Sequence, residues 1–304
     1  MKKHKFENKY FLLTVLIVFV PILIFFILAN YLLQTVHFTL ITEILIYSLF
    51  SIILAFIITA GVAIFNPTID DAMFTLRRLL RFESLSNPLL LKLSIQAPGT
   101  YHHSLNVSNL AQRACKSIGA NSLLTRTAAY YHDIGKLSNP TLFVENQAEN
   151  EIPITESVQQ IKSSAQKIIS HVENGIKIAK ENNLPEEIID LIAEHHGTTR
   201  VLYFYKKAVE RGIKIKKTDF RYPGPKPQSK ESAVLMISDC VEAAVRAEQN
   251  LNKDMIIQIV NNIITERFQE SQFKNTDLSD NDIIKIKNSV VDTLMSIYHQ
   301  RIRY

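Results

Sequence analysis

Two long runs without a charged residue stand near the start of this chain, and they limit its architecture more than any other feature. They extend from Phe11 to Leu33 and from Ile44 to Phe65. At ~1.5 Å per residue, a helix formed by either run can cross a hydrocarbon core ~30 Å thick. The first run is longer than the apolar core of a cleaved signal peptide, and no small-residue cleavage site follows it. We therefore predict two transmembrane helices.

The basic residues near these runs predict the orientation. The connection between the runs, residues 30–43, contains no lysine or arginine, whereas both outer flanks do. Positive flanks stay in the cytoplasm. We expect a multi-pass protein of the cell (plasma) membrane with both termini cytoplasmic, which agrees with two isolated cysteines in a reducing compartment. The flanking cations are Lys2, Lys3, Lys5 and Lys9 before the first run, and Arg77, Arg78 and Arg81 after the second.

The remainder of the chain shows helical periodicity and no alternating pattern typical of strands. We predict an all-α fold made of two N-terminal transmembrane helices followed by a cytosolic helical bundle. The expected divisions are a transmembrane hairpin (1–65), a juxtamembrane connector helix capped by Thr68 (66–87) and a cytosolic domain (88–304). The expected helices of that domain are 89–95, 104–118, 122–131, 155–182 with a break before His171, 185–196, 229–248, 253–270 and 279–303.

One irregular segment, residues 211–230, interrupts the helices and carries several prolines, lysines and arginines. A stretch of this length without clear structure is often functional. It could be a basic flap over a phosphate-bearing substrate or a solvated surface loop. The net charge of +5 likewise fits a nucleic-acid binder, a membrane protein with basic flanks, or an enzyme for an anionic substrate.

Metal-ligand residue types recur through the predicted bundle. His132 and Asp133 are adjacent where a helix is expected to end, and the two oxygens of such an aspartate can bridge two cations. Asp239 lies in an apolar run, where a charge needs a partner or a metal. Taken together, the pattern predicts a metal site. Its candidate ligands are His103, His132, Asp133, His171 (expected mid-helix), His195, His196 and Asp239.

The order of these residues resembles that of the HD-domain phosphohydrolases. The segments 97–104, 130–136, 145–147, 220–227 and 298–302 are similar to the cytosolic domain of seven-transmembrane HD proteins that hydrolyse cyclic di-AMP. Residues 197–200, Gly-Thr-Thr-Arg, do not match the Gly-Tyr-Pro signature of the subgroup that acts on cyclic di-GMP.

The resemblance implies two divalent metal ions, manganese or iron, joined by Asp133. One ion would take His103, His132, Asp133 and Asp239, and the other Asp133, His171, His195 and His196. It also implies a membrane-anchored phosphodiesterase that opens cyclic di-AMP to pApA with a metal-activated hydroxide. Asp133 and Lys136 would be catalytic. His102 lies one residue along a helix from His103 and should face elsewhere, so we expect it to be structural. Arg221, Glu145, Asn146 and Gln147 would contact substrate.

Other interpretations stay open. The domain could hydrolyse another cyclic or linear nucleotide, or act as a non-catalytic nucleotide-sensing relay. The partners expected are cyclic di-AMP and the lipid bilayer, without polymeric nucleic acid, and a homodimer is left open. Two spans are fewer than the family's seven, so the chain is either a natural short form or a fragment. Met1 followed by a basic segment favours a true start.

Overall fold

The computed structural model describes residues 27, 31, 40–65, 78–84, 86–147, 158–212, 216–248 and 250–298. The chain divides into two compact units, Met1–Arg78 and Leu79–Tyr304. In the first unit, helix α2 (Leu40–Phe65) contains the second uncharged run. None of the helices in the described ranges meets the length and apolar character needed to cross a membrane. The first uncharged run, apart from residues 27 and 31, and the predicted cap at Thr68 lie outside the described residues.

The second unit confirms the all-α prediction. Its described residues contain helices and one isolated antiparallel bridge, between Arg200 and Arg221. The α-helices are α4 (Pro88–Gln96), α5 (Pro98–Ser117), α6 (Ser122–Tyr131), α7 (Val158–Ile169), α8 (His171–Glu181), α9 (Glu186–Glu194), α10 (Leu202–Glu210), α11 (Lys230–Arg246), α12 (Lys253–Gln269) and α13 (Asp280–Ile297), and the 3-10 helices are η1 (Ile134–Ser138), η2 (Pro140–Leu142), η3 (Val144–Asn146) and η4 (Lys217–Phe220).

Side-chain caps begin several of these helices. The Asn87 side chain accepts a hydrogen bond from the backbone of Leu89 at the start of α4. Ser229 and Ser232 form a reciprocal capping box at the start of α11, and α13 begins with an equivalent pair. Such bonds satisfy backbone N–H groups that have no partner inside the helix. Polar side chains therefore set where α4, α11 and α13 begin.

Some predicted boundaries were wrong. Helix α5 begins at Pro98 and not at residue 104, because proline is favoured in the first turn of a helix. Only Ala97 separates α5 from α4. Helix α4 therefore ends, and α5 begins, within the same Ala-Pro-Gly segment. The predicted break before His171 is confirmed, because α8 begins at His171 after Ser170, whereas the expectation that His171 lies in mid-helix was wrong. Helix α10 was missed, and η4 occupies part of the segment expected to be irregular.

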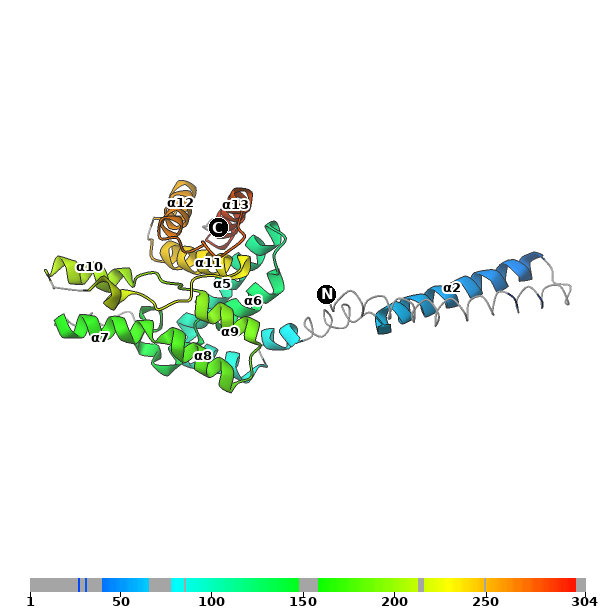
Figure 1. Ribbon diagram of the computed structural model, residues 1–304, viewed down its shortest axis with the longest axis horizontal. Helices are drawn as coiled ribbons and strands as arrows, with labels where there is room; N and C mark the ends of the chain where they lie inside the picture. The colour runs from blue at the N-terminus through cyan, green and yellow to red at the C-terminus, as the bar shows by residue number, and fades with distance from the viewer. Residues whose placement is uncertain are drawn as a thin grey trace, which may run out of the picture. The chain divides into compact units, whose positions relative to one another are not determined.

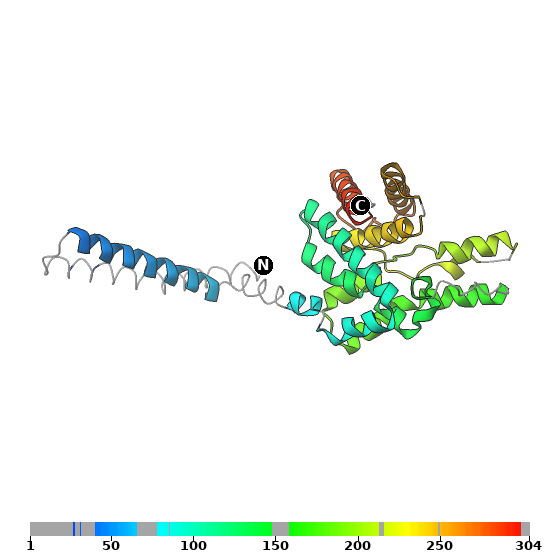
Figure 2. The ribbon, with the colours of Figure 1, turned by 180° about the vertical axis from the view of Figure 1, so that it is seen from behind.

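The core of the second unit surrounds α5, which packs against α4, α6, α11 and α13. One apolar cluster joins α5 to α11, α12 and α13, and includes Leu110 and Val290. A second cluster joins α4, α6 and α9 around Leu93 and Ile192. Helices α7 and α10 lie side by side in both views (Figures 1 and 2), and a small apolar cluster with Phe220 joins them.

The first residues of the second unit bind to α6 through side-chain contacts. The Glu83 carboxylate pairs with the Arg126 guanidinium and accepts a hydrogen bond of 2.8 Å from the Thr127 hydroxyl. The Tyr131 hydroxyl donates to the backbone carbonyl of Phe82 at 2.5 Å. These contacts fix the helix whose last turn leads directly to His132 and Asp133.

Candidate metal centre

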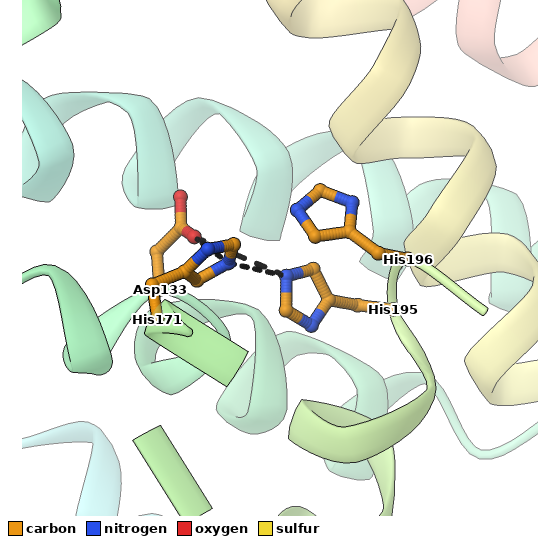
Figure 3. Close-up of side chains that lie close together, drawn as sticks. All are labelled: Asp133, His171, His195 and His196. Carbon is orange, nitrogen blue, oxygen red and sulfur yellow. Dashed lines mark hydrogen bonds and ion pairs between the residues drawn. The ribbon is translucent and has the colours of Figure 1, made fainter. Parts of the chain in front are cut away.

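Five helices bring the seven predicted ligand residues together, and most of these residues lie at helix ends. A helix end allows a side chain to turn toward a common centre while the backbone leaves the helix. The three rings and the carboxylate drawn in Figure 3 turn toward one another. The contributors are His103 on α5, His132 and Asp133 after α6, His171 at the start of α8, His195 and His196 after α9, and Asp239 on α11.

Asp133 lies at the centre of this arrangement. One of its oxygens, Oδ1, is 3.2 Å from His171 Nε2 and 3.9 Å from His195 Nε2. The other, Oδ2, is 3.2 Å from His132 Nε2 and 3.8 Å from His103 Nε2. The two oxygens therefore face two different pairs of imidazoles. A carboxylate in this position can serve two cations at once.

The ligand atoms form two groups, and within each group they lie within 4.8 Å of one another. The first group is Asp133, His171, His195 and His196. In the second group, Asp239 Oδ1 is 3.0 Å from His103 Nε2 and 3.7 Å from His132 Nε2. Mixed imidazole and carboxylate donors suit divalent transition metals. Each group is a cluster that could hold a metal ion.

Backbone carbonyls orient three of the imidazoles. The Nδ1 atoms of His132, His171 and His195 lie 2.8, 2.6 and 2.6 Å from carbonyl oxygens three residues earlier in the chain. A carbonyl oxygen only accepts, so Nδ1 must donate, and in the neutral ring Nε2 carries the lone pair. The same local geometry thus turns each Nε2 toward the centre.

A buried carboxylate, Glu242, orients the imidazole of His103 in place of a backbone carbonyl. Its Oε2 atom makes a short hydrogen bond with His103 Nδ1. Its Oε1 atom accepts bonds of 3.1 Å from the Asn106 amide and 3.2 Å from the Tyr298 hydroxyl. Carboxylate partners of this kind fix the ring and raise its basicity as a ligand. Sequence reasoning missed Glu242, although it follows Asp239 by one helical turn.

Replacing Glu242 by glutamine is expected to weaken metal binding about 10- to 100-fold, since the amide cannot supply the same negative charge to His103. Metal titration of the purified chain, followed by calorimetry, measures the change. Glu248→Gln is the matched control, because Glu248 is exposed just beyond the end of the same helix. Equal metal affinity in the Glu242 variant and the control would contradict a positioning role.

The charge states of Asp133 and His195 suit metal binding. Burial alone would raise the pKa of Asp133, but Lys136 and His132 hold it well below its usual range. Burial, together with His132 and His171, lowers the pKa of His195 to about 3. The carboxylate is therefore ionised and the imidazole neutral near pH 7, which are the forms that bind cations. Burial alone would lower the pKa of His132, but Asp133 and Asp239 raise it to about 10, so a cation must displace a proton from that ring.

Two buried polar atoms between the ligand groups have no hydrogen-bond partner among the described residues, as expected of atoms that bind a metal ion. They are His132 Nε2 and Asp133 Oδ1. An unsatisfied buried polar atom costs about 1–3 kcal/mol. Both atoms face the ligand groups, and a cation would satisfy both. The donor set and its unsatisfied atoms therefore fit metal ions.

Five residues of the two groups line a cavity of about 280 Å³, namely His103, Asp133, His171, His196 and Asp239. Lys136 lies in its wall, 2.8 Å from Asp133 Oδ2 and 2.6 Å from Glu145 Oε1. The side chains are mixed in type, with charged groups of both signs beside aromatic rings. Such a lining suits a ligand that has both phosphate and ring components. The wall residues include Lys136, Phe143, Glu145, Arg200, Tyr222, Arg246 and Arg267.

Of the four residues predicted to contact substrate, one lines the cavity and three do not. Glu145 lines the cavity, whereas Asn146, Gln147 and Arg221 do not. The Asn146 side chain bonds to both the backbone and the hydroxyl of Thr100, which fastens η3 to the start of α5. Exposed His102, expected to be structural, lies outside the cavity lining. Sequence reasoning missed Tyr222, whose ring stacks on His196 with centroids 4.2 Å apart.

The chain is similar in sequence to an established domain family and to two curated bacterial proteins. Residues 100–244 match the HD domain. The chain is 45% identical to the cyclic-di-AMP phosphodiesterase PgpH of Listeria monocytogenes over 250 residues, and 43% identical to that of Bacillus subtilis over 227 residues. These alignments cover 82% and 75% of this chain but 34% and 32% of the relatives. The chain thus spans about a third of the length of the curated relatives it matches.

A solved structure gives the same result for the bundle. The crystal structure of the Listeria PgpH HD domain in complex with cyclic-di-AMP aligns with a TM-score of 0.66 and 47% sequence identity. The alignment covers 71% of this chain and the whole of that domain. The fold and the sequence therefore point to one family.

Proposed function

This chain belongs to the HD-domain family, and we propose that it is a metal-dependent phosphodiesterase that hydrolyses cyclic di-AMP to pApA. One observation carries the proposal: seven ligand-type side chains form two groups next to each other around Asp133, and five of the seven line one cavity. The likeness to an HD domain crystallised with cyclic-di-AMP supports the choice of substrate.

Two divalent ions, manganese or iron, would be held by the two ligand groups with Asp133 shared between them. Bound there, such ions supply an activated water and neutralise phosphate oxygens during in-line attack. The reaction adds water across one phosphodiester bond: the attacking oxygen joins phosphorus, and the departing 3′ oxygen gains a proton. Opening one bond of the ring leaves a linear dinucleotide with a 5′ phosphate.

The chain's own residues prepare this site in three ways. The backbone carbonyls and Glu242 hold the imidazoles in the orientation that binds metal. Glu145 and Asp133 hold the Lys136 ammonium between them at the cavity wall, where it can approach a phosphate oxygen. Phe143 and Tyr222 present aromatic surface to the same cavity, which suits contact with a base.

Chelation tests the proposal directly. The full chain, purified in detergent and supplied with Mn²⁺, is expected to convert cyclic di-AMP to pApA, and EDTA should stop the reaction until metal is restored. Chromatography of the products measures both. Absence of chelator-sensitive pApA would exclude the enzyme and favour a nucleotide-sensing relay. Faster turnover of cyclic di-GMP or guanosine tetraphosphate would instead assign another substrate.

Membrane anchoring is part of the same proposal and rests on the sequence. The two uncharged runs and their basic outer flanks support two spans in the cell membrane with both termini cytoplasmic. The bilayer would then be a partner of the chain, as proposed from the sequence, and a homodimer stays open. Recovery of the full chain in the soluble fraction of lysed cells would contradict the anchoring.

A further inference from the structure

Three arginines converge on a single carboxylate beside the cavity. Arg200 Nη2 and Arg221 Nη2 lie 3.1 and 3.7 Å from Glu270 Oε1, and Arg267 Nη1 lies 3.2 Å from Glu270 Oε2. Arg200 and Arg267 line the cavity itself. We call these three residues the arginine cluster. Neither the ligand groups nor the proposed chemistry accounts for it.

The backbone holds the cluster in place. An isolated antiparallel bridge pairs Arg200 with Arg221, and backbone bonds of 2.9 Å from Val201 to Phe220 and from Tyr222 to Thr199 flank it. Arg221 Nη1 also donates to a backbone carbonyl, that of Thr198, at 2.6 Å. These bonds hold the segments of Arg200 and Arg221 side by side, and Glu270 joins Arg267 to them.

Positive charge is in excess here. The Lys226 ammonium adds a fourth cation and donates to the backbone carbonyls of Glu270 and Ser271 at 3.1 and 2.9 Å. The only carboxylate besides Glu270 that pairs with the cluster, among the described residues, is Glu266, 3.8 Å from Arg267. Four cations therefore face two carboxylates. Like charges held this close favour binding of an anion.

Two donors in the cluster are buried without a partner. The Nε atoms of Arg200 and Arg267 find no acceptor among the described residues. The Arg267 side chain is only 9% exposed, so water does not readily compensate it. Its guanidinium also interacts with Cys240, the residue directly after the ligand-type Asp239. Arg200 and Arg267 thus each combine a buried, unpaired Nε–H with a place in the lining of the cavity that also includes His196 and Asp239.

We propose that Arg200 and Arg267 form an anion subsite for the second phosphate of a cyclic dinucleotide, the one that is not being hydrolysed. Guanidinium groups bind phosphate oxygens with paired N–H donors, which fits this role better than a lysine would. Glu270 and Arg221 keep the subsite residues in position. The inference rests on the proposed function, since it requires a substrate with two phosphates.

Two substrates separate the subsite from the metal centre. Cyclic di-AMP has two phosphates, whereas bis(p-nitrophenyl) phosphate has one and needs only the metal centre. For Arg267→Gln and Arg200→Gln we expect KM for cyclic di-AMP to rise about 10- to 100-fold, the range for a hydrogen bond to a charged group. The ratio of kcat/KM for cyclic di-AMP to that for bis(p-nitrophenyl) phosphate should fall by a similar factor.

Three controls make the test specific. Arg113→Gln removes the same charge from an exposed position on α5 and should leave the ratio unchanged. Arg267→Lys keeps the charge and should recover part of the lost affinity. Circular dichroism checks folding, and Arg200→Gln is the safer variant because that side chain is 25% exposed. Equal losses on both substrates, or an unchanged KM for cyclic di-AMP, would overturn the subsite.

Binding measured in EDTA distinguishes failure of the subsite from failure of the proposed function. Calorimetry of cyclic di-AMP with the metal-free chain needs no turnover. Arg-dependent binding without hydrolysis by the wild-type chain would retain the subsite and overturn the proposed activity. Hydrolysis by the wild-type chain, with unchanged binding in both arginine variants, would retain the proposed activity and overturn the subsite. No binding by the metal-free wild-type chain would overturn the subsite, whereas only the absence of hydrolysis with Mn²⁺ would overturn the proposed activity.

Discussion

Replacing Asp133 by alanine is expected to abolish hydrolysis while the bundle stays folded. The two oxygens of Asp133 face the two ligand groups, so its loss weakens both groups together. Losing this shared ligand should raise the barrier by several kcal/mol, or lower kcat by roughly 10³-fold or more. Phosphodiesterase assays and metal analysis of the same preparation measure the two effects.

The thermal response to metal provides a second measurement. Metal that binds only the folded chain raises Tm, so Mn²⁺ should stabilise the wild-type chain more than the Asp133→Ala variant. Asp190→Ala is the matched control, since it removes an exposed carboxylate from α9. Its Tm shift with Mn²⁺ should equal that of the wild type. Full activity in Asp133→Ala, or an undiminished Tm shift with Mn²⁺, would contradict a shared ligand.

The seven candidate ligand residues could be predicted from the sequence because the signals that mark several of them are local. A histidine next to an aspartate at an expected helix end needs no knowledge of tertiary structure, and neither does a charge within the apolar run before Asp239. The break before His171 was also predictable, whereas the start of α5 was not, because Pro98 can end one helix or begin the next. Local signals thus predicted the residue types better than the helix boundaries.

Other parts of the site depend on tertiary contacts. Glu242 could have been found, since it lies one turn after Asp239 on the same face of a helix. The arginine cluster could not, because it combines residues 200, 221 and 267 through one bridge and one carboxylate. Asn146 was expected at the substrate, but it fastens a 3-10 turn to α5. The position of Asn146 shortly after the His-Asp motif did not show whether it contacts substrate or Thr100.

Replacing Gly135 by alanine is expected to disrupt the metal centre although no ligand is changed. A Cβ at Gly135 would lie 1.8 Å from the backbone oxygen of His171 and 2.5 Å from the backbone nitrogen of Gly175. Backbone atoms cannot yield as a flexible side chain can, so η1 and α8 must separate. Asp133 precedes η1 and His171 begins α8, so the shift parts two ligands that are now 3.2 Å apart.

The expected cost is about 3 kcal/mol or more in the free energy of unfolding, at the upper end for an overpacked interior. Metal affinity should fall with it. Gly175→Ala is the matched comparison at the same interface. Its Cβ would lie 3.2 Å from the Ile192 side chain, which can adjust, so its loss should be smaller. Urea unfolding and metal titration measure both variants. A Gly135→Ala chain as stable and as tightly metal-bound as Gly175→Ala would show that η1 does not fix the position of Asp133 against α8.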